Sequence, residues 1–151
     1  MPTREQVIWI AGFFDGEGCV NIERGYGYSS CLRITISNTV KESLNLIKRW
    51  LDFGVVKSHN KGKKYKNQKN GWIFVCYGTN AKNFLELVYP YLIIKKEQAN
   101  TGLRYYEYYK SSNKRFHTLS KEVIEQREVF NKQMAILNQR GKSNYASIGG
   151  A

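Results

Sequence analysis

The segment IAGFFDGEG, residues 10–18, decides how the rest of the chain is interpreted. It completes the run EQVIWIAGFF, residues 5–14, which has helical periodicity. One stripe of this helix carries Ile8, Ala11, Gly12 and Asp15. Gly16 and Gly18 are placed to end the helix, because glycine disfavours helix interiors and is common where helices stop. The sequence therefore predicts a short helix that ends in an acidic turn formed by Asp15 and Glu17.

Two hairpins are predicted after this turn. Apolar and polar side chains alternate over residues 19–22 and 32–36, which is typical of half-buried strands. The glycines, tyrosines and serines of residues 25–30 favour a turn, so these two strands should form a hairpin. The β-rich runs at residues 55–60 and 72–77 predict a second hairpin with a long basic loop.

Helical periodicity marks most of the remaining chain. Thr39 and Glu42 have the spacing of a capping box, and apolar residues then recur at helical spacing up to Gly54. Three further helices are expected near residues 79–90, 98–109 and 120–137. We expect one domain over residues 1–140 and a flexible tail over residues 141–151. The order of elements predicts an α+β fold: an antiparallel four-stranded sheet with helices on one face.

The alternation in the strands also predicts which side chains face away from the helices. An apolar set should pack against the helices: Val20, Ile22, Leu32, Ile34, Ile36, Ile73, Val75 and Tyr77. The alternate residues should form the outer face: Asn21, Glu23, Arg33, Thr35, Ser37, Lys57, His59, Lys61, Trp72, Phe74 and Cys76. Such a mixture of donors, acceptors and apolar groups suits base edges in a DNA major groove, although a solvated sheet face would carry similar residues.

The charge of the chain favours a polyanionic partner. Its 151 residues include 24 Lys and Arg against 12 Asp and Glu, a net charge of +12. Six lysines and no acidic residue lie between residues 57 and 69, and five of them belong to the expected loop: Lys61, Lys63, Lys64, Lys66 and Lys69. By itself this run could be a solvated loop. Beside a mixed polar sheet face, it indicates a surface that neutralises phosphates of a nucleic acid.

Other classes of protein fit the sequence less well. Three cysteines at wide spacing, without a CxxC pair, indicate neither a disulfide framework nor a zinc ribbon. His59 and His117 are the only histidines, which argues against a histidine-metal nuclease or a zinc site. No apolar run is long enough to cross a bilayer, and residues 1–6 lack a secretory signal pattern. We therefore expect no membrane partner and a reducing intracellular location, in a prokaryotic cytoplasm or an organelle.

Residues 10–18 resemble the nine-residue signature of the LAGLIDADG homing endonucleases. The identical letters are Ala11, Gly12, Asp15 and Gly18, Gly16 stands where the signature has Ala, and Glu17 replaces the last Asp. The changes at Ile10, Phe13 and Phe14 are conservative. The order of helix, strands and basic loop over residues 7–137 is also similar to that family. The resemblance implies a curved sheet that forms a saddle over double-stranded DNA. The implied activity is site-specific, intron-homing cleavage of a long, nearly palindromic target.

The resemblance also implies an active site. Glu17 occupies the position of a metal-binding carboxylate, and the stretch YPYLIIKKEQAN, residues 89–100, is similar to the one that carries the active-site lysine of single-motif members. That lysine falls on Lys95, and a polar residue at the end of the second strand falls on Asn38. Oxygen ligands beside a phosphodiester suit Mg²⁺, so the Glu17 carboxylate and the Gly16 carbonyl are the expected ligands. Mn²⁺ is expected to substitute, and Ca²⁺ to bind without supporting cleavage.

A single copy of the motif implies a homodimer. Small residues in the first helix would let two copies approach closely, and the expected interface residues are Ile8, Ala11, Gly12 and Asp15. Two-fold symmetry would then supply one carboxylate set for each DNA strand. Two other functions fit the sequence: an RNA-splicing maturase that binds intron RNA, and a non-catalytic dimeric DNA-binding regulator. Neither of them has a physical need for Glu17 and Lys95.

Overall fold

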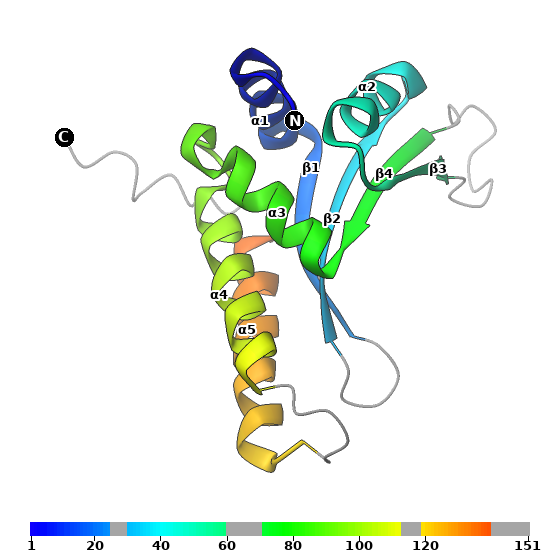
Figure 1. The fold of residues 1–151 in the computed structure, drawn as a ribbon. Coiled ribbons are helices and arrows are strands. Elements are labelled where there is room, and N and C mark those ends of the chain that lie inside the picture. Colours follow the sequence, from blue (N-terminus) through cyan, green and yellow to red (C-terminus); the bar gives the residue numbers. More distant parts are fainter. Residues whose placement is uncertain (25–29, 60–70, 113–118, 140–151) are drawn as a thin grey trace.

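The computed structural model describes residues 1–24, 30–59, 71–112 and 119–139. Its elements follow the order expected from the sequence (Figure 1). They are α1 (Arg4–Glu17), β1 (Gly18–Arg24), β2 (Ser30–Asn38), α2 (Lys41–Leu51), β3 (Val55–His59), β4 (Gly71–Tyr77), α3 (Gly78–Val88), the 3-10 helix η1 (Tyr89–Tyr91), α4 (Lys96–Ser112) and α5 (Lys121–Leu137). The α+β prediction is confirmed. The expected basic loop and C-terminal tail lie outside the described residues.

The strands form one antiparallel sheet in the order β1-β2-β4-β3. Helices α1, α2 and α3 cover one face of this sheet, and α4 and α5 pack against each other and reach β1 (Figure 1). The predicted arrangement, a four-stranded antiparallel sheet with helices on one face, is therefore confirmed. None of the helices in the described ranges is both long and apolar enough to cross a membrane.

A cluster of aromatic rings fixes α1 on the sheet. The ring centroid of Phe84 in α3 lies 4.9 Å from that of Phe14 in α1 and 6.4 Å from that of Phe74 in β4. All three side chains are fully buried. Burying one large apolar side chain contributes about 1.5–3 kcal/mol, so this cluster ties the last turns of α1 firmly to the sheet.

Both ends of α1 are set by local contacts. The Thr3 hydroxyl accepts a hydrogen bond from the Gln6 backbone, and the Gln6 side chain accepts one from the Thr3 backbone, which makes a capping box. At the other end Gly18 leads directly into β1, and a side chain at Gly18 would overlap the ring of Phe14. Glycine is therefore needed at this close approach.

The predicted face of β4 is wrong. Ile34 lies across from Cys76, and Ile36 lies across from Phe74. Directly opposed residues share a face of a sheet, so Phe74 and Cys76 point into the core, where they are 0% and 2% exposed. Trp72, two residues before Phe74, lies on the same side. The outer face of β4 is formed instead by Ile73, Val75 and Tyr77.

The predicted start of α2 is also wrong. The residue before the helix is Val40, which makes no side-chain cap, so the capping box expected from Thr39 and Glu42 does not form. The Asn38 side chain instead accepts a hydrogen bond of 2.8 Å from the Val40 backbone. This local bond closes the turn from β2 into α2.

Candidate active site

The acidic turn lies where α1 ends and β1 begins. Gly16 and Glu17 are both exposed, and Glu17 is the last residue of α1. Carbonyl groups in the last turn of a helix lack partners within the helix and carry a partial negative charge. The Glu17 carboxylate and the Gly16 carbonyl therefore present oxygen donors that suit a hard cation.

Asp15 has a different role from the one expected. It is 8% exposed, and its carboxylate accepts hydrogen bonds from the backbone of Ile93 (2.8 Å), Ile94 (3.2 Å) and Lys95 (2.9 Å). The predicted place of Asp15 in a dimer interface is wrong, because the side chain points into its own subunit. The same correction applies to Ala11, which is 0% exposed in the subunit core.

Both the backbone and the side-chain ammonium of Lys95 are held beside this turn by hydrogen bonds to Asp15. Its backbone donates to the Asp15 carboxylate, and its ammonium group donates to the Asp15 backbone carbonyl. Burial lowers the pKa of Lys95 below its ordinary value, and electrostatic interactions with Asp15, Cys19 and Glu17 act in the opposite direction. The ammonium of Lys95 thus lies within the electrostatic reach of the Glu17 carboxylate.

Asn38 ends the strand next to this turn. Because Gly18 lies across from Ile36, the end of β2 is at the same end of the sheet as Glu17. The side-chain oxygen of Asn38 is occupied by the Val40 backbone, whereas its amide NH₂ makes no hydrogen bond within the described residues. That NH₂ group can therefore donate to water or to a phosphate oxygen.

A hydrated divalent cation fits the donors of the turn. Among the described residues, no group of three or more His, Cys, Asp or Glu side chains could hold a metal ion. The described part of one subunit therefore offers few protein ligands, chiefly the Glu17 carboxylate and the Gly16 carbonyl. Mg²⁺ usually keeps several waters and binds through one or two carboxylates and a phosphate, which matches this small set of oxygen donors.

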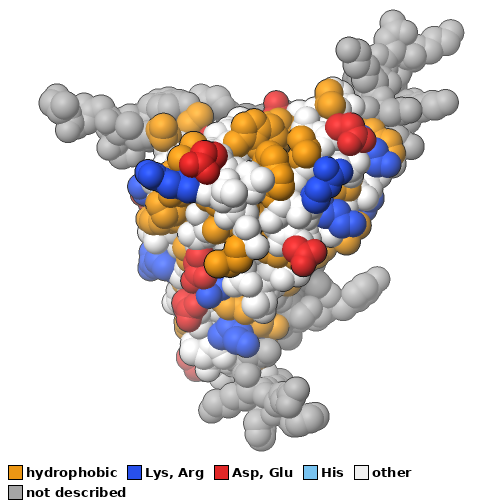
Figure 2. Space-filling model, turned by 45° about the horizontal axis from the view of Figure 1, so that its top comes forward, with side chains coloured by type: hydrophobic (Ala, Val, Ile, Leu, Met, Phe, Trp, Pro, Cys, Tyr) orange, Lys and Arg blue, Asp and Glu red, His pale blue; other side chains and the backbone are white. Residues whose placement is uncertain are grey.

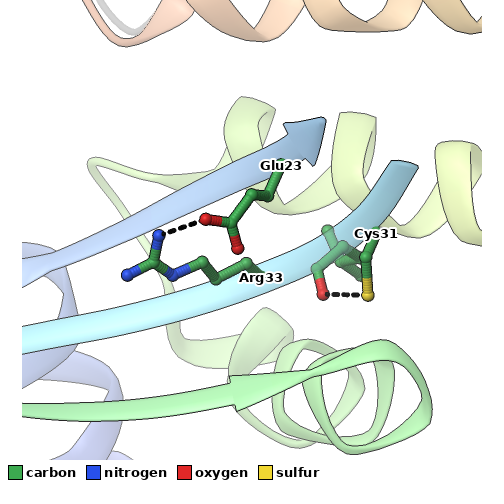
Figure 3. A network of polar contacts seen from close by, with 4 residues as sticks. Glu23, Cys31 and Arg33 are labelled. Atoms are coloured by element: carbon green, nitrogen blue, oxygen red, sulfur yellow. Dashed lines mark hydrogen bonds and ion pairs between the residues drawn. The ribbon is translucent and has the colours of Figure 1, made fainter. Parts of the chain in front are cut away.

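The outer face of the sheet carries an ordered arginine. The Arg33 guanidinium donates a hydrogen bond of 3.0 Å to the Glu23 carboxylate, as Figure 3 shows. The guanidinium carbon also lies 5.8 Å from the ring centroid of Tyr77. The Arg33 Nε is buried and has no hydrogen-bond partner among the described residues. Glu23 and Tyr77 thus orient Arg33 without occupying all of its donors.

The strand registers place several of the predicted DNA-contacting residues on this outer face: Asn21, Glu23, Arg33, Thr35, Ser37, Lys57 and His59. Trp72, Phe74 and Cys76 face the helices instead, so the prediction that they reach base edges is wrong. Lys61, Lys63, Lys64 and Lys66 lie outside the described residues. Sequence reasoning missed Tyr77, which is 43% exposed on the outer face. Its position opposite Arg33 follows only from the register of β2 and β4.

The exposed side of α1 carries Ile8 and Gly12. Ile8 is 44% exposed, and a Cβ added at Gly12 would have no described atom within 4 Å. The packing of the subunit therefore does not explain a glycine in the middle of this helix. Figure 2 turns the end of the molecule with α1 and α2 toward the reader and shows hydrophobic side chains at its surface among charged ones.

Known proteins share both sequence and fold with this chain. A family model described as a LAGLIDADG-like domain matches residues 4–89. The DNA endonuclease I-CvuI of Chlorella vulgaris is 31% identical over 104 residues, which cover 64% of this chain and 60% of that protein. The match thus spans less than two thirds of the length of this relative.

Solved structures resemble the fold over most of the chain. The homing endonuclease I-CvuI, in complex with the I-CreI target, has a TM-score of 0.73 at 24% identity and matches 93% of this chain and 85% of that one. The archaeal intron-encoded homing endonuclease I-Vdi141I, complexed with DNA, has a TM-score of 0.71 at 16% identity and matches 93% of this chain and 89% of that one. Because the family model covers more than half of its residues and the fold agrees, the chain belongs to the LAGLIDADG-like domain family.

Proposed function

We propose that this protein is a site-specific homing endonuclease that binds double-stranded DNA as a homodimer and hydrolyses one phosphodiester in each strand. The observation that carries the proposal is the unit formed by the exposed Glu17 carboxylate and the Lys95 ammonium at one end of the sheet. I-CvuI, which is named a DNA endonuclease, has been crystallised with DNA in the presence of Mg and of Ca.

The residues of the turn suit hydrolysis of a phosphodiester. In this reaction a water oxygen attacks phosphorus, the bond from phosphorus to the 3′ oxygen breaks, the water loses a proton and the leaving oxygen gains one. The Lys95 ammonium would offset the negative charge that develops on the phosphate. Its partial burial reduces screening by solvent, which strengthens that effect. The NH₂ group of Asn38 would hold the water or a phosphate oxygen.

We propose Glu17 and the Gly16 carbonyl as the ligands of Mg²⁺. When bound, the ion would polarise the phosphate and lower the pKa of a coordinated water. Mn²⁺ offers similar chemistry and should replace Mg²⁺. Ca²⁺ should occupy the same oxygen donors but hold the phosphate without supporting cleavage, since it is larger and less strict in its geometry.

The outer face of the sheet is the proposed DNA-binding surface. Arg33, held by Glu23 and Tyr77, would read a base edge in the major groove, where arginine commonly contacts guanine. Lys57 is exposed on the same face and would contact a phosphate. The net charge of +12 should make DNA binding strongly dependent on salt.

The proposed homodimer is supported by the exposed side of α1. A glycine inside a helix costs roughly 0.5–1 kcal/mol relative to alanine, and Gly12 has no described neighbour that would forbid a side chain. A second α1 whose backbone crosses Gly12 would explain the glycine, because a side chain there would keep the two helices apart. Ile8 would bury its exposed side chain in the same contact.

A cleavage selection tests the proposal. Purified protein is incubated with Mg²⁺ and a library of plasmids that carry randomised duplex segments, and linearised molecules are recovered and sequenced. We expect one nearly palindromic sequence family with double-strand breaks. Replacing Mg²⁺ by Ca²⁺ should preserve binding to the selected sequence and stop the cleavage.

The variant Glu17→Gln is the matched control. It should bind the selected DNA in Ca²⁺ as the wild type does and lose cleavage in Mg²⁺ by more than about 100-fold, because a metal contributes several kcal/mol to such reactions. Sequence-specific binding without cleavage by the wild type would instead indicate a regulator. Binding and splicing of an intron RNA without DNA cleavage would indicate a maturase.

A further inference from the structure

The strongest unexplained feature of the site is the buried carboxylate of Asp15. Both of its oxygens are used: Oδ2 accepts hydrogen bonds from Ile93 and Ile94, and Oδ1 accepts one from Lys95. These three backbone groups belong to the segment between η1 and α4, which starts at Lys96. One side chain of α1 thus fixes three consecutive residues that lie far along the chain.

Little else among the described contacts holds this segment. The side chains of Ile93 and Ile94 are 69% and 47% exposed, so they contribute little packing against the rest of the subunit. The segment has no regular secondary structure to order it. Its backbone position therefore depends on the Asp15 carboxylate, with the ends anchored by buried Leu92 and by α4.

We propose that Asp15 is a positioning residue, which sets the place of the Lys95 ammonium relative to the Glu17 carboxylate. Asp15 holds the Lys95 backbone through its side chain and the Lys95 ammonium through its own carbonyl oxygen. It is also two residues before Glu17 on the same helical end. Asp15 therefore joins the two groups within one subunit and needs no contact with DNA to affect the reaction.

The inference rests on the proposed endonuclease function and predicts a specific coupling. The substitution Asp15→Asn keeps the size of the side chain, but its NH₂ group would face backbone donors that now face a carboxylate oxygen. The segment should then shift by a fraction of an ångström or more. Misplacement of a catalytic group by about 1 Å can reduce a rate by as much as about 100-fold, so we expect a loss of about 10- to 100-fold.

The test is a double-mutant cycle on the single-turnover cleavage rate, with Asp15→Asn, Lys95→Met and the double variant. If Asp15 acts through Lys95, Asp15→Asn should slow cleavage strongly in the wild-type background and by less than about twofold when Lys95 is already replaced. The affinity for DNA in Ca²⁺ should change little. Equal losses in both backgrounds, or a loss confined to affinity, would overturn the inference.

A matched substitution controls for the loss of one negative charge. Asp52→Asn changes an exposed residue with a φ of 59°, a conformation that Asn also adopts, and should leave the cleavage rate unchanged.

Amide hydrogen exchange of the wild-type protein keeps the inference testable even if Asp15→Asn does not fold. The amides of residues 93–95 should be protected, and free exchange there beside a protected α1 would contradict the positioning role. If the wild type cuts no duplex, the proposed function fails. The exchange result still tests whether the Asp15 carboxylate holds the backbone of residues 93–95.

Discussion

The Lys95 backbone donates a hydrogen bond of 2.9 Å to the carboxylate of Asp15, a residue 80 positions earlier in the chain. This bond joins the residue just before α4 to the end of α1 in the same subunit. As a result, the Lys95 ammonium and the Glu17 carboxylate belong to one structural unit. Each half of a homodimer would therefore carry its own metal-binding carboxylate and its own ammonium group, and dimer formation would only have to bring the two units to the two DNA strands.

The substitution Lys95→Met should separate catalysis from binding. Methionine keeps much of the side-chain volume but removes the charge that would face the developing negative charge on the phosphate. We expect the single-turnover cleavage rate to fall by about 100-fold, the size seen when one stabilising donor is removed from an active site. The affinity for the selected DNA in Ca²⁺ should fall by a much smaller factor.

Lys96→Met is the natural control, because it makes the same change one residue later. Lys96 is exposed, and its ammonium lies 5.3 Å from the ring centroid of Tyr89, away from the Asp15 contacts. This variant should cleave at nearly the wild-type rate. If Lys95→Met and Lys96→Met weaken DNA binding alike and leave the cleavage rate intact, Lys95 only anchors a phosphate.

Arg33→Lys should relax the sequence preference at one position of the target. The planar guanidinium is oriented by Glu23 and Tyr77 and can contact guanine with two donors, which an ammonium cannot reproduce. We expect a loss of about 1–3 kcal/mol of discrimination at that base pair, measured by repeating the cleavage selection with the variant.

Lys57→Met gives the contrasting result on the same face of the sheet. A lysine that contacts a phosphate should weaken binding to all sequences alike and lower the slope of log affinity against log salt by about 1. If Arg33→Lys behaves in the same way, with an unchanged selected sequence, then Arg33 contacts the backbone of DNA and does not read a base.

Local signals explain why the first helix and its acidic turn could be predicted. The glycines at 16 and 18 and the spacing of apolar residues before them act within a few residues, so α1 and the place of Glu17 at its end followed from the sequence. The partners of Asp15 lie 78 to 80 residues away, and no local pattern reports them. The helix is also apolar on several sides, so periodicity could not tell that Ala11 faces the core and Ile8 the surface.

The error in β4 has a similar physical origin. Period-two alternation identifies the buried face of a strand only when polar residues mark the other face. In residues 72–77 every side chain is apolar or aromatic, so either phase looks equally good. The pairing of Phe74 with Ile36 decides the phase, and that pairing is a property of the assembled sheet.

The thiol of Cys76 should be unreactive in the folded protein. Cys76 is 2% exposed, and burial raises its pKa to about 12 from 9.0. At pH 8 only about one Cys76 thiol in ten thousand would be ionised, and the thiolate is the reactive form. Alkylation followed by peptide mapping should label half-buried Cys19 and Cys31 well before Cys76.

The raised pKa of Cys76 also predicts how the free energy of unfolding depends on pH. The folded state holds the Cys76 proton more tightly than the unfolded state, and this difference stabilises the fold. The stabilisation is complete below pH 9.0 and is lost as pH rises toward about 12. The stability difference between wild type and Cys76→Ala should therefore shrink over that range. Rapid native labelling of Cys76, or a constant difference, would show that the thiol is less buried than its place opposite Ile34 implies.

Gly54→Ala should destabilise the fold without touching the active site. Gly54 has a φ of +86°, which L-residues rarely adopt, and a Cβ there would overlap the ring of Phe74 in the core. We expect the free energy of unfolding to fall by about 2–4 kcal/mol from backbone strain and overpacking together. Gly71→Ala is the control, because its nearest described contact would be the His59 carbonyl at 3.7 Å. Equal unfolding midpoints for the two variants in urea would show that Gly54 is not required by its backbone conformation and its contact with Phe74.

Gly12→Ala should have opposite effects on the subunit and on the dimer. Within one subunit the new methyl group meets no described atom, and alanine favours a helix over glycine by roughly 0.5–1 kcal/mol. If a second α1 lies against Gly12, the same methyl group separates the two helices and weakens their contact. Sedimentation should therefore show more monomer for the variant than for wild type, both free and on DNA.

Gly102→Ala is the control that separates a weakened contact between two α1 helices from a change in helix propensity alone. Gly102 is also inside a helix, but a Cβ there would lie 3.0 Å from Leu85 and Val20, which are fully buried and cannot easily move aside. It should gain little or no stability and should leave the dimer intact, because the added methyl group stays in the core. The unfolding of a dimer depends on protein concentration, so the midpoints must be compared at several concentrations. If Gly12→Ala stabilises the protein and still sediments as wild type does on DNA, the helix surface around Gly12 is not where two subunits meet.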